Sequence, residues 1–534
     1  MYVDENSYEK VNEAWNSATK VLFGEPMGEL KDYGPWLSDY LELPHERKSS
    51  ISQKEVALSI GDYSKGAKYA SMDELDFSKK FEPLSLNELK DMDSLTEALN
   101  ERFVYSGNTI LGKSSSVQKS TDVIDSHYIY GCSLIDASKY SAYSRYLHYS
   151  EYCFGIYGTI KSSNAIKCSG SKFTRCFECH SSEILSDCYY CGSMQNSSNC
   201  MFSFGGRGKS YLIGNRQFTK EEYFRLKKKL LGEISQKLKT EKKIYSLFSI
   251  LQECRKYPPE IKISGANEEP EFNLEPIQTA FSTTSKIVLG ADLGNLEDYA
   301  DYLYSHVPQN VPLKSPFTGR EALIAGYRKI IGDIYNLNGR ILPDDEVQQV
   351  ANFSVDKNNI NEMDASNLSS VCQNLHKIAY SDLDKVVGNN MNVKGSAVTI
   401  DAQDSYMGSA NIRCKKCAYS FWPDTSENIF GSYVTWESAF CINCYNSRKL
   451  QRCFEVSDSH QCSDCYFSHN IENCTDCMFC FNVKSKRYAI GNVEYPKEEY
   501  LKLKKLILNE ISSKLEKSKK LEMSIFNLGC KHGH

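Results

Sequence analysis

The sequence contains several pairs of cysteines separated by two residues, a spacing that suits metal binding. In two places, eight residues separate one C-x2-C pair from the next. These two sets of four are Cys176, Cys179, Cys188 and Cys191, and Cys462, Cys465, Cys474 and Cys477. Four thiolates in such a pattern are typical of a tetrahedral zinc site, with Zn–S bonds of about 2.3 Å. The sequence therefore predicts Zn²⁺ as a cofactor.

A third candidate metal site has the spacing of a zinc ribbon. It consists of Cys414 and Cys417 with Cys441 and Cys444. If the chain coils with a period of twelve residues, as argued below, these two pairs lie two coils apart. They could then share one ion only through a bulge, so this site ranks behind the other two.

Two alternatives to metal binding remain open for all of these cysteines. Stacked cysteines also suit disulfides, which need Cα separations of about 4.4–6.8 Å. The thiols could equally be small core residues, since cysteine tolerates burial well. The first residues, MYVDENSYEK, do not resemble a secretory signal, and in a reducing compartment metal ligands or thiols are more common than disulfides.

The cysteines follow a period of twelve residues. Cys417, Cys441, Cys453, Cys465 and Cys477 lie on one ladder of twelve-residue steps, and Cys176, Cys188 and Cys200 keep the same step. Cys153 and Ala165 continue the series upstream after a slip of one residue. The residue after each of these cysteines is usually large and apolar, such as Phe177 or Phe454. A twelve-residue period does not match helical turns, but it suits a chain that closes one coil per repeat at the strand spacing of about 4.8 Å. We expect a narrow β-solenoid with small residues inside.

Almost the whole sequence is duplicated. The segment beginning SYLIGN at Ser210 recurs as RYAIGN at Arg487, 277 residues later, and KVLFGEPMGELKDYGPWL at Lys20 recurs at Lys286. We therefore expect an α+β fold with two repeats, each made of an α-rich or mixed head, a Cys-rich β-solenoid and an amphipathic helix. The predicted boundaries are 1–118, 119–216 and 217–254 for repeat 1, 255–276 for a linker, and 277–396, 397–493 and 494–534 for repeat 2.

Each predicted solenoid ends in an amphipathic helix with a lysine-rich face. Thr219 and Glu222 predict a capping box in repeat 1, and Pro496 suits a first helical residue in repeat 2. One apolar stripe contains Tyr223, Leu226, Leu230, Ile234 and Leu238, and the other contains Tyr500, Leu503, Ile507, Ile511 and Leu515. We expect these helices to cover the open end of each solenoid.

The segment from Gly107 to Ser114 matches the phosphate-binding pattern G-x4-G-K-S. A working loop of this kind needs a helix that starts at the Lys–Ser pair. The residues that follow, SSSVQKSTDVID, lack the apolar face of such a helix. A polar loop that leads into the solenoid is therefore the expected structure.

The bulk composition excludes several classes of protein. The 534 residues carry a net charge of −5, so no overall basic field points to nucleic acid, and no apolar run approaches the about 20 residues that span a bilayer. The 21 cysteines fit a reducing environment. We expect a cytoplasmic protein without membrane contact, with incorporation into a particle as one setting.

The run QCSDCYFSHNIENCTDCMFCFNVKSKRYAIGNVEYPKEEY resembles the C-terminal part of uncharacterised cysteine-rich twelve-residue-repeat proteins. Those proteins also pass through short C-x2-C coils into a YxIGN-like segment and a KEEY helix. The resemblance covers the two cysteine-rich stretches and their helices. It implies the coiled fold and no activity.

No catalytic set stands out, and we expect a non-enzymatic protein. The duplication suits a structural or assembly role as a scaffold or particle component, with itself or other assembly proteins as partners. A homo-oligomer or a place in a larger complex follows from that role. The alternative is a zinc-dependent RNA- or ribosome-associated factor that uses the tyrosines and lysines along the coils.

Overall fold

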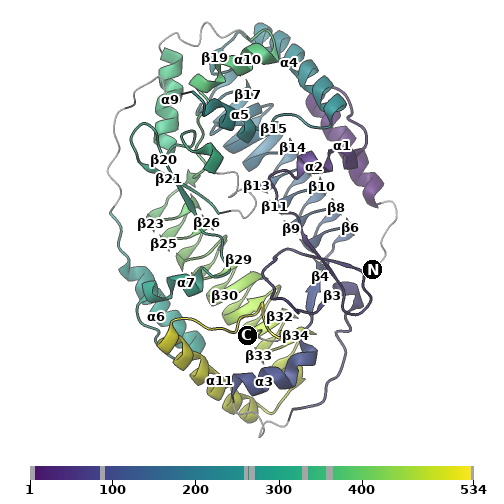
Figure 1. Cartoon of the computed structure of the whole chain (residues 1–534), viewed down its shortest axis with the longest axis vertical. Coiled ribbons are helices and arrows are strands. Elements are labelled where there is room, and N and C mark those ends of the chain that lie inside the picture. Colours follow the sequence, from purple (N-terminus) through teal and green to yellow (C-terminus); the bar gives the residue numbers. More distant parts are fainter. Residues whose placement is uncertain are drawn as a thin grey trace. The chain divides into compact units, whose positions relative to one another are not determined.

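The computed structural model describes residues 7–84, 91–257, 263, 271–326, 335–356 and 365–530. The described chain is a mixed α/β fold with many strands in large open sheets and several helices (Figure 1). Most of the predicted linker, 255–276, lies outside the described residues.

Two compact units divide the chain, and neither is a continuous segment. Unit 1 contains Met1–Pro44, Ile110–Glu268 and Val311–Lys385. Unit 2 contains His45–Thr109, Glu269–Asn310 and Val386–His534. Each unit therefore combines a cysteine-rich stretch with segments from both repeats.

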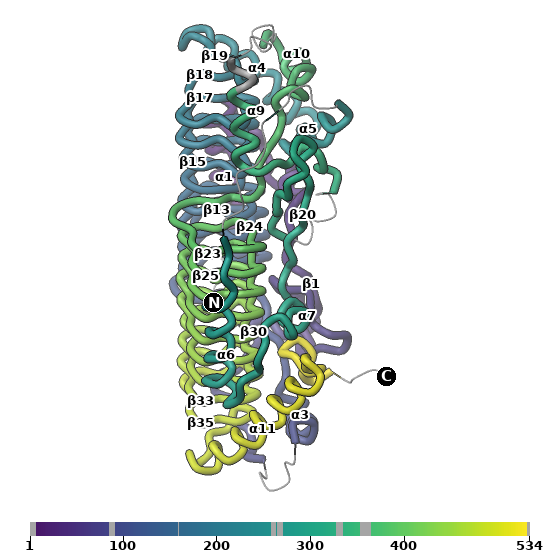
Figure 2. The backbone as a smooth tube through the Cα atoms, turned by 90° about the vertical axis from the view of Figure 1, so that its left-hand side faces the viewer, coloured from purple at the N-terminus to yellow at the C-terminus, as the bar shows by residue number. Residues whose placement is uncertain are grey.

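The cysteine-rich stretch of unit 1 forms a stack of short parallel strands, called stack 1. One face contains β5 (Ile110–Leu111), β7 (Thr121–Ile124), β9 (Ser133–Asp136), β11 (Arg145–His148) and β13 (Tyr157–Ile160). The other contains β6 (Ser115–Gln118), β8 (His127–Tyr130), β10 (Lys139–Ala142), β12 (Glu151–Phe154) and β14 (Ser163–Ile166). The long β15 (Ser169–Ser186) joins both faces, and β16 (Tyr189–Gly192), β17 (Gln195–Met201), β18 (Ser210–Ile213) and β19 (Arg216–Gln217) complete the stack, whose turns Figure 2 shows at regular intervals.

Unit 2 contains the equivalent stack 2. Its first strands are β22 (Val386–Val387), β23 (Met391–Lys394), β24 (Ala397–Ile400), β25 (Gln403–Tyr406), β26 (Ser409–Ile412) and β27 (Lys415–Ala418). They are followed by β28 (Glu427–Phe430), β29 (Tyr433–Trp436), β30 (Ala439–Arg448), β31 (Gln451–Ser457) and β32 (Ser463–Glu472). The last are β33 (Thr475–Met478), β34 (Phe481–Lys484), β35 (Arg487–Ile490) and β36 (Val493–Glu494).

The predicted twelve-residue period is confirmed as the strand register. Lys139 pairs with Glu151 in stack 1, and Cys441 pairs with Cys453 in stack 2. The predicted one-residue slip is also present, because Ala165 pairs with Cys176, eleven residues later. Like residues therefore lie above one another in both stacks.

A left-handed backbone conformation at every third residue sets the shape of each coil. In stack 1 the run of positive φ angles includes Asp122, Asp125, Tyr128, Gly131, Leu134, Ala137 and Tyr140. Such a conformation costs a non-glycine residue about 1–3 kcal/mol and persists only where the surroundings enforce it. The inward-facing positions consequently recur every three residues instead of every two, as in Val123, Ser126, Ile129 and Cys132, which are at most 1% exposed.

Small inward side chains complete the hydrogen bonding between coils. Ser138 donates its hydroxyl to the carbonyl of Asp136 at 2.8 Å and accepts the N–H of Ser150, twelve residues on, at 3.0 Å. Cys132 fills the same role, because its sulfur accepts the N–H of Ser144 at 3.3 Å. A buried N–H that would otherwise lack a partner is thus satisfied by the coil before it.

Helices cover one outer face of each stack. The helix α1 (Ser7–Phe23) lies against β8, β10 and β14 (Figure 1). The ring of its Trp15 lies 5.3 Å from that of Phe154 between centroids. In unit 2, α6 (Glu275–Leu289) places Phe281 5.2 Å from Phe430. The large residues that follow the cysteine rungs are therefore covered by helices. Short helical turns follow each of them: η1 (Leu30–Tyr33) with α2 (Gly34–Leu37), and η4 (Leu296–Tyr299) with α7 (Ala300–Leu303).

The two predicted terminal helices are α4 (Lys220–Glu241) and α11 (Lys497–Ser518), and each contacts the last strands of its stack. Thr219 and Glu222 form the predicted capping box. Pro496 is the N-cap, so its prediction as the first helical residue was wrong by one position. Both apolar stripes face inward, although Leu226 is only half-buried. A short helix, α5 (Leu247–Cys254), follows α4.

A polypeptide arm completes each unit. In unit 2 it contains β1 (His45–Lys48), β2 (Glu55–Leu58), β3 (Tyr69–Ser71), η2 (Met72–Glu74), α3 (Met92–Leu99), η3 (Asn100–Arg102) and β4 (Tyr105–Gly107). In unit 1 it contains β20 (Val311–Lys314), β21 (Glu321–Ile324), η5 (Tyr335–Leu337), α9 (Asp344–Asp356), α10 (Leu368–Asn374) and η6 (Leu375–Lys377). Each arm carries an antiparallel hairpin, β1–β2 or β20–β21.

The hydrogen bonds of inward serines can be tested at Ser138. We expect Ser138→Ala to lower the free energy of unfolding by about 1–3 kcal/mol, because the buried N–H of Ser150 loses its acceptor. Ser138→Cys should cost less, since Cys132 already accepts such a bond. Urea denaturation followed by circular dichroism measures both variants, and equal losses for alanine and cysteine would contradict the explanation.

Candidate functional site

All twelve cysteines predicted as zinc ligands lie inside the two stacks. None of their side chains is more than 2% exposed. Cys176, Cys179, Cys188 and Cys191 belong to the core of stack 1. Cys414, Cys417, Cys441, Cys444, Cys462, Cys465, Cys474 and Cys477 belong to the core of stack 2.

The first set of four is brought together on neighbouring coils. Cys179 pairs directly with Cys191 in the strand register. The thiols of Cys176, Cys191 and Cys200 hydrogen-bond to the sulfur of Cys188 and hold the pKa of Cys188 well below its usual range. Cys200 was not among the predicted ligands, although its place on the twelve-residue ladder could have indicated it.

The second set of four is also brought together. Cys465 pairs with Cys477 in the register, and Cys462 and Cys474 interact through their thiols. The same group continues on one side to Cys453 and on the other to Cys480. The third set is separated as expected, because Ile429 pairs with Cys441 and lies between the two C-x2-C pairs.

The C-x2-C spacing has a structural cause in this fold. Two residues separate consecutive inward positions, so both cysteines of a pair point into the same coil. Apart from Cys414, whose sulfur contacts the Ser405 hydroxyl, each donates its S–H to a carbonyl two residues earlier, as Cys191 does to Tyr189 at 3.6 Å and Cys477 to Thr475 at 3.5 Å. Serine occupies equivalent positions elsewhere, as at Ser138. The spacing is therefore explained without metal, and burial raises the pKa of the Cys132 thiol to about 12.

Across the described parts of both stacks, no group of three or more His, Cys, Asp or Glu side chains has the arrangement of a metal site. The thiols in question already donate to backbone carbonyls, as Cys188 does to Ser197 at 3.8 Å and Cys465 to Cys474 at 3.7 Å. Zinc binding by the predicted sets stays a prediction.

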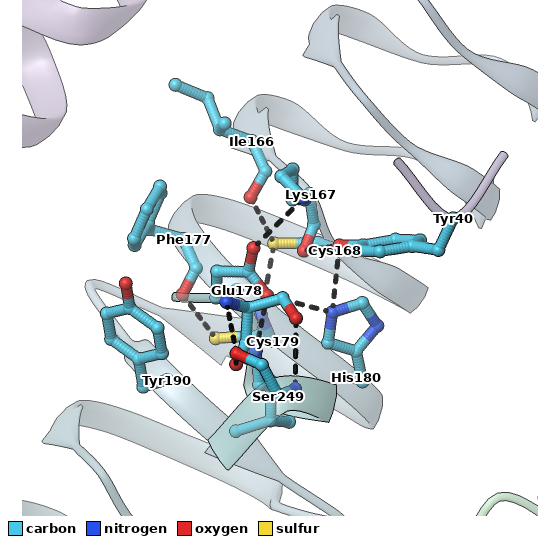
Figure 3. A network of polar contacts seen from close by, with 12 residues as sticks. Tyr40, Ile166, Lys167, Cys168, Phe177, Glu178, Cys179, His180, Tyr190 and Ser249 are labelled. Atoms are coloured by element: carbon cyan, nitrogen blue, oxygen red, sulfur yellow. Dashed lines mark hydrogen bonds and ion pairs between the residues drawn. The ribbon is translucent and has the colours of Figure 1, made fainter. Parts of the chain in front are cut away.

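A cluster of buried charged side chains lies beside the thiols of unit 1 (Figure 3). Glu178 accepts the N–H of Leu247, the first residue of α5, at 2.8 Å and lies 3.7 Å from the Lys167 ammonium group. Lys167 also donates to Asp39 at 2.6 Å. His180 lies 3.4 Å from Glu178 and 3.2 Å from the Tyr40 hydroxyl. Burial raises the pKa of Tyr40 well above its ordinary value.

Unit 2 contains an equivalent glutamate with different partners. Glu455 accepts the N–H of Ile525 at 2.8 Å, as Glu178 accepts that of Leu247. Asn443 lies one coil before Glu455, where unit 1 has Lys167, and donates to the carboxylate at 2.9 Å. Tyr302 donates to the same oxygen at 3.3 Å. Burial raises the pKa of Glu455, and among the residues that the structure describes no lysine pairs with its carboxylate.

These glutamates anchor the segments that follow the terminal helices. Glu178, Lys167 and His180 are at most 1% exposed, so the cluster offers little access to a substrate. A buried carboxylate that accepts a backbone N–H fixes the chain that donates it. Sequence reasoning missed both residues, yet the recurrence of Phe-Glu at Phe177–Glu178 and Phe454–Glu455 was a visible signal.

The phosphate-binding pattern does not form a phosphate loop. The strand β6 follows Ser114 directly, and Gly107 belongs to β4. The N–H of Lys113 donates to Asp125 at 2.8 Å and is not directed at an open site. The expected polar loop is only partly present, because Ile110–Leu111 within this segment already form β5, the first strand of stack 1.

Comparisons with known proteins assign neither a family nor a function to the chain. No family model matches the chain, and neither the curated proteins nor the solved structures include a significant match. Within the described residues, no helix has the length and apolar character needed to cross a membrane.

The raised pKa of Glu455 makes stability depend on pH. A carboxyl whose pKa is higher in the folded state favours folding at low pH, and this contribution is lost as the pH rises through the folded pKa. Glu455→Gln should therefore match the wild-type melting temperature at pH 4 and exceed it at pH 8.

Thermal unfolding between pH 4 and pH 8 checks this expectation. Glu498→Gln on the exposed start of α11 is the matched control and should leave the pH profile unchanged. A wild-type advantage for Glu455 that grows with pH would contradict the sign.

Proposed function

We propose that each stack is a β-solenoid of about twelve residues per coil and that the chain is a non-enzymatic structural or assembly protein. The observation that carries this proposal is the filling of inward positions by small side chains that bond to the neighbouring coil. Ser138 and Cys132 illustrate the two residue types that do this. Such bonding makes the stacks rigid, and the inward polar groups are used in hydrogen bonds within the stack.

Rigid stacks of this kind suit a scaffold or particle component. Repeated coils present long regular faces, which solenoid proteins use for binding. Two similar stacks on one chain can offer the same contact twice. We propose itself or other assembly proteins as partners, in a homo-oligomer or a larger complex.

Zinc is the proposed cofactor of this scaffold, at the two sets of four cysteines. The packing of both sets on neighbouring coils supports it, because Cys179 pairs with Cys191 and Cys465 pairs with Cys477, and thiols that lie together could lose their protons to bind one ion. A zinc ion there would replace S–H···O and S–H···S contacts by shorter metal bonds. The competing explanation is that the same thiols only fill the core.

Native mass spectrometry with metal analysis tests assembly and zinc together. We expect species larger than the 60.7 kDa monomer and two zinc ions per chain, one for each set. Cys188→Ser should lose one ion, whereas Cys132→Ser, outside both sets, should retain both. A monomer at every concentration contradicts the assembly role, and a folded, metal-free chain contradicts zinc.

RNA binding is the second candidate function, and one observation favours it. The outer faces of the terminal helices expose basic residues at equivalent positions, Arg225 and Lys228 on α4 and Lys502 and Lys505 on α11. A phosphate backbone would be attracted to such faces, with binding that falls steeply as salt increases.

Fluorescence anisotropy with a single-stranded RNA tests this candidate. Replacing Lys228 and Lys505 with glutamate should weaken binding at least tenfold and reduce its salt dependence, because both phosphate contacts are lost. Lys10→Glu combined with Lys48→Glu, at two other exposed lysines, changes the net charge by the same amount and should change binding little. Affinity that is insensitive to salt, or equal for all variants, would exclude an RNA role for these helices.

A further inference from the structure

The two arms lie in the opposite units from the repeats to which they belong. Arm 1, His45–Thr109, lies within repeat 1 of the sequence but belongs to unit 2 with stack 2. Arm 2, Val311–Lys385, lies within repeat 2 but belongs to unit 1 with stack 1. Each stack is therefore completed by the arm of the other repeat.

The two arms are equivalent structures. Each begins with a hairpin, in which His45 pairs with Leu58 and Val311 pairs with Ile324. A parallel pairing follows in both, between β3 and β4 in arm 1 and between Ile341 and Ser381 in arm 2. A short helix lies between the paired segments, α3 in arm 1 and α10 in arm 2.

The helix of each arm docks through the same hydrogen bond. The N–H of Met92, the first residue of α3, donates to Glu510 on α11 at 2.8 Å. The N–H of Leu368, the first residue of α10, donates to Glu233 on α4 at 2.9 Å. A carboxylate at a helix N-terminus is stabilised by both the N–H group and the helix dipole.

The final segment of each arm, β4 in arm 1 and the residues around Ser381 in arm 2, docks on the stack through a second shared bond. The N–H of Ser106 donates to the Nε2 atom of His469 at 2.9 Å in unit 2. The N–H of Asp382 donates to the hydroxyl of Ser193 at 2.7 Å in unit 1. His469 and Ser193 are equivalent, since 276 residues separate them in the duplicated sequence.

In each arm a large buried side chain donates further hydrogen bonds to the segment that follows the terminal helix. In arm 1, the fully buried Tyr105 donates its hydroxyl to the carbonyls of Ile525 and Leu528, beyond α11. In arm 2, Arg340 is 1% exposed and donates to the carbonyls of Cys254 and Tyr257 at the end of α5. Removing an arm would leave these carbonyls and the apolar faces beneath them in water.

We propose that the two repeats are non-covalent partners held together by reciprocal exchange of their arms, so that the covalent link between them is not needed for association. The partner that each repeat recognises is another repeat, with its arm as the docking element. This inference is independent of the scaffold role and would hold for any function of the chain.

Cleavage of the intact protein between the repeats tests the proposal. A protease site inserted between Glu268 and Glu269 separates the sequence into the two repeats after folding. We expect the cut halves to co-elute with the mass of the intact chain, 60.7 kDa, and to keep the circular dichroism spectrum of the uncut protein. Halves that separate into two folded species would overturn the proposal.

Variants of the cut protein show whether the arms hold the halves together. Combined Glu233→Ala and Glu510→Ala remove the acceptors for both arm helices, and the cut halves should then dissociate at least tenfold more readily on dilution. Glu516→Ala, on an exposed position of α11, is the matched control and should dissociate like the wild type. Equal dissociation of both variants would overturn the role of the arms, and the uncut variants, checked by circular dichroism, confirm that folding is retained.

Discussion

The narrow interior of a twelve-residue coil is the constraint on which the rest of this structure depends. An inward position every third residue allows four inward side chains per coil, and neighbouring coils approach to the spacing of paired strands. Small residues fit this space, and those with a hydroxyl or thiol also supply the acceptor that a buried N–H requires. The left-handed residues that create the geometry are strained singly and stable only as a continuous array.

This constraint gives the cysteine pattern a meaning that does not depend on metal. The C-x2-C pair marks two consecutive inward positions, and a step of twelve marks the same position on the next coil. Zinc ligation and core packing therefore share one sequence signature. Zinc ligands are deprotonated, whereas thiols that only fill the core keep their protons. The two explanations therefore predict different protonation states for Cys188, which three other thiols surround.

Polar groups buried outside the coils connect the stacks to the rest of each unit. Glu178 and Glu455 hold the segments after the terminal helices by accepting a backbone N–H, one with a lysine nearby and one without. The duplicated copies have kept this bond while changing its electrostatic environment. The arms are held in the same way, by carboxylates on α4 and α11, so that anchoring of backbone N–H groups is the common means of assembly within a unit.

The sequence by itself determined the local and periodic features: the duplication, the twelve-residue register, the slip before Cys176 and the capping box at Thr219. These follow from residue spacing, which reports which positions share a face. Only the tertiary structure decided that inward positions recur at every third residue, that Glu178 and Glu455 are buried anchors, and that each arm joins the other repeat's stack. Those outcomes depend on left-handed φ angles, which residues as different as Asp122, Leu134 and Tyr140 adopt, and on contacts between segments far apart in the sequence. Residue types mark neither of these features.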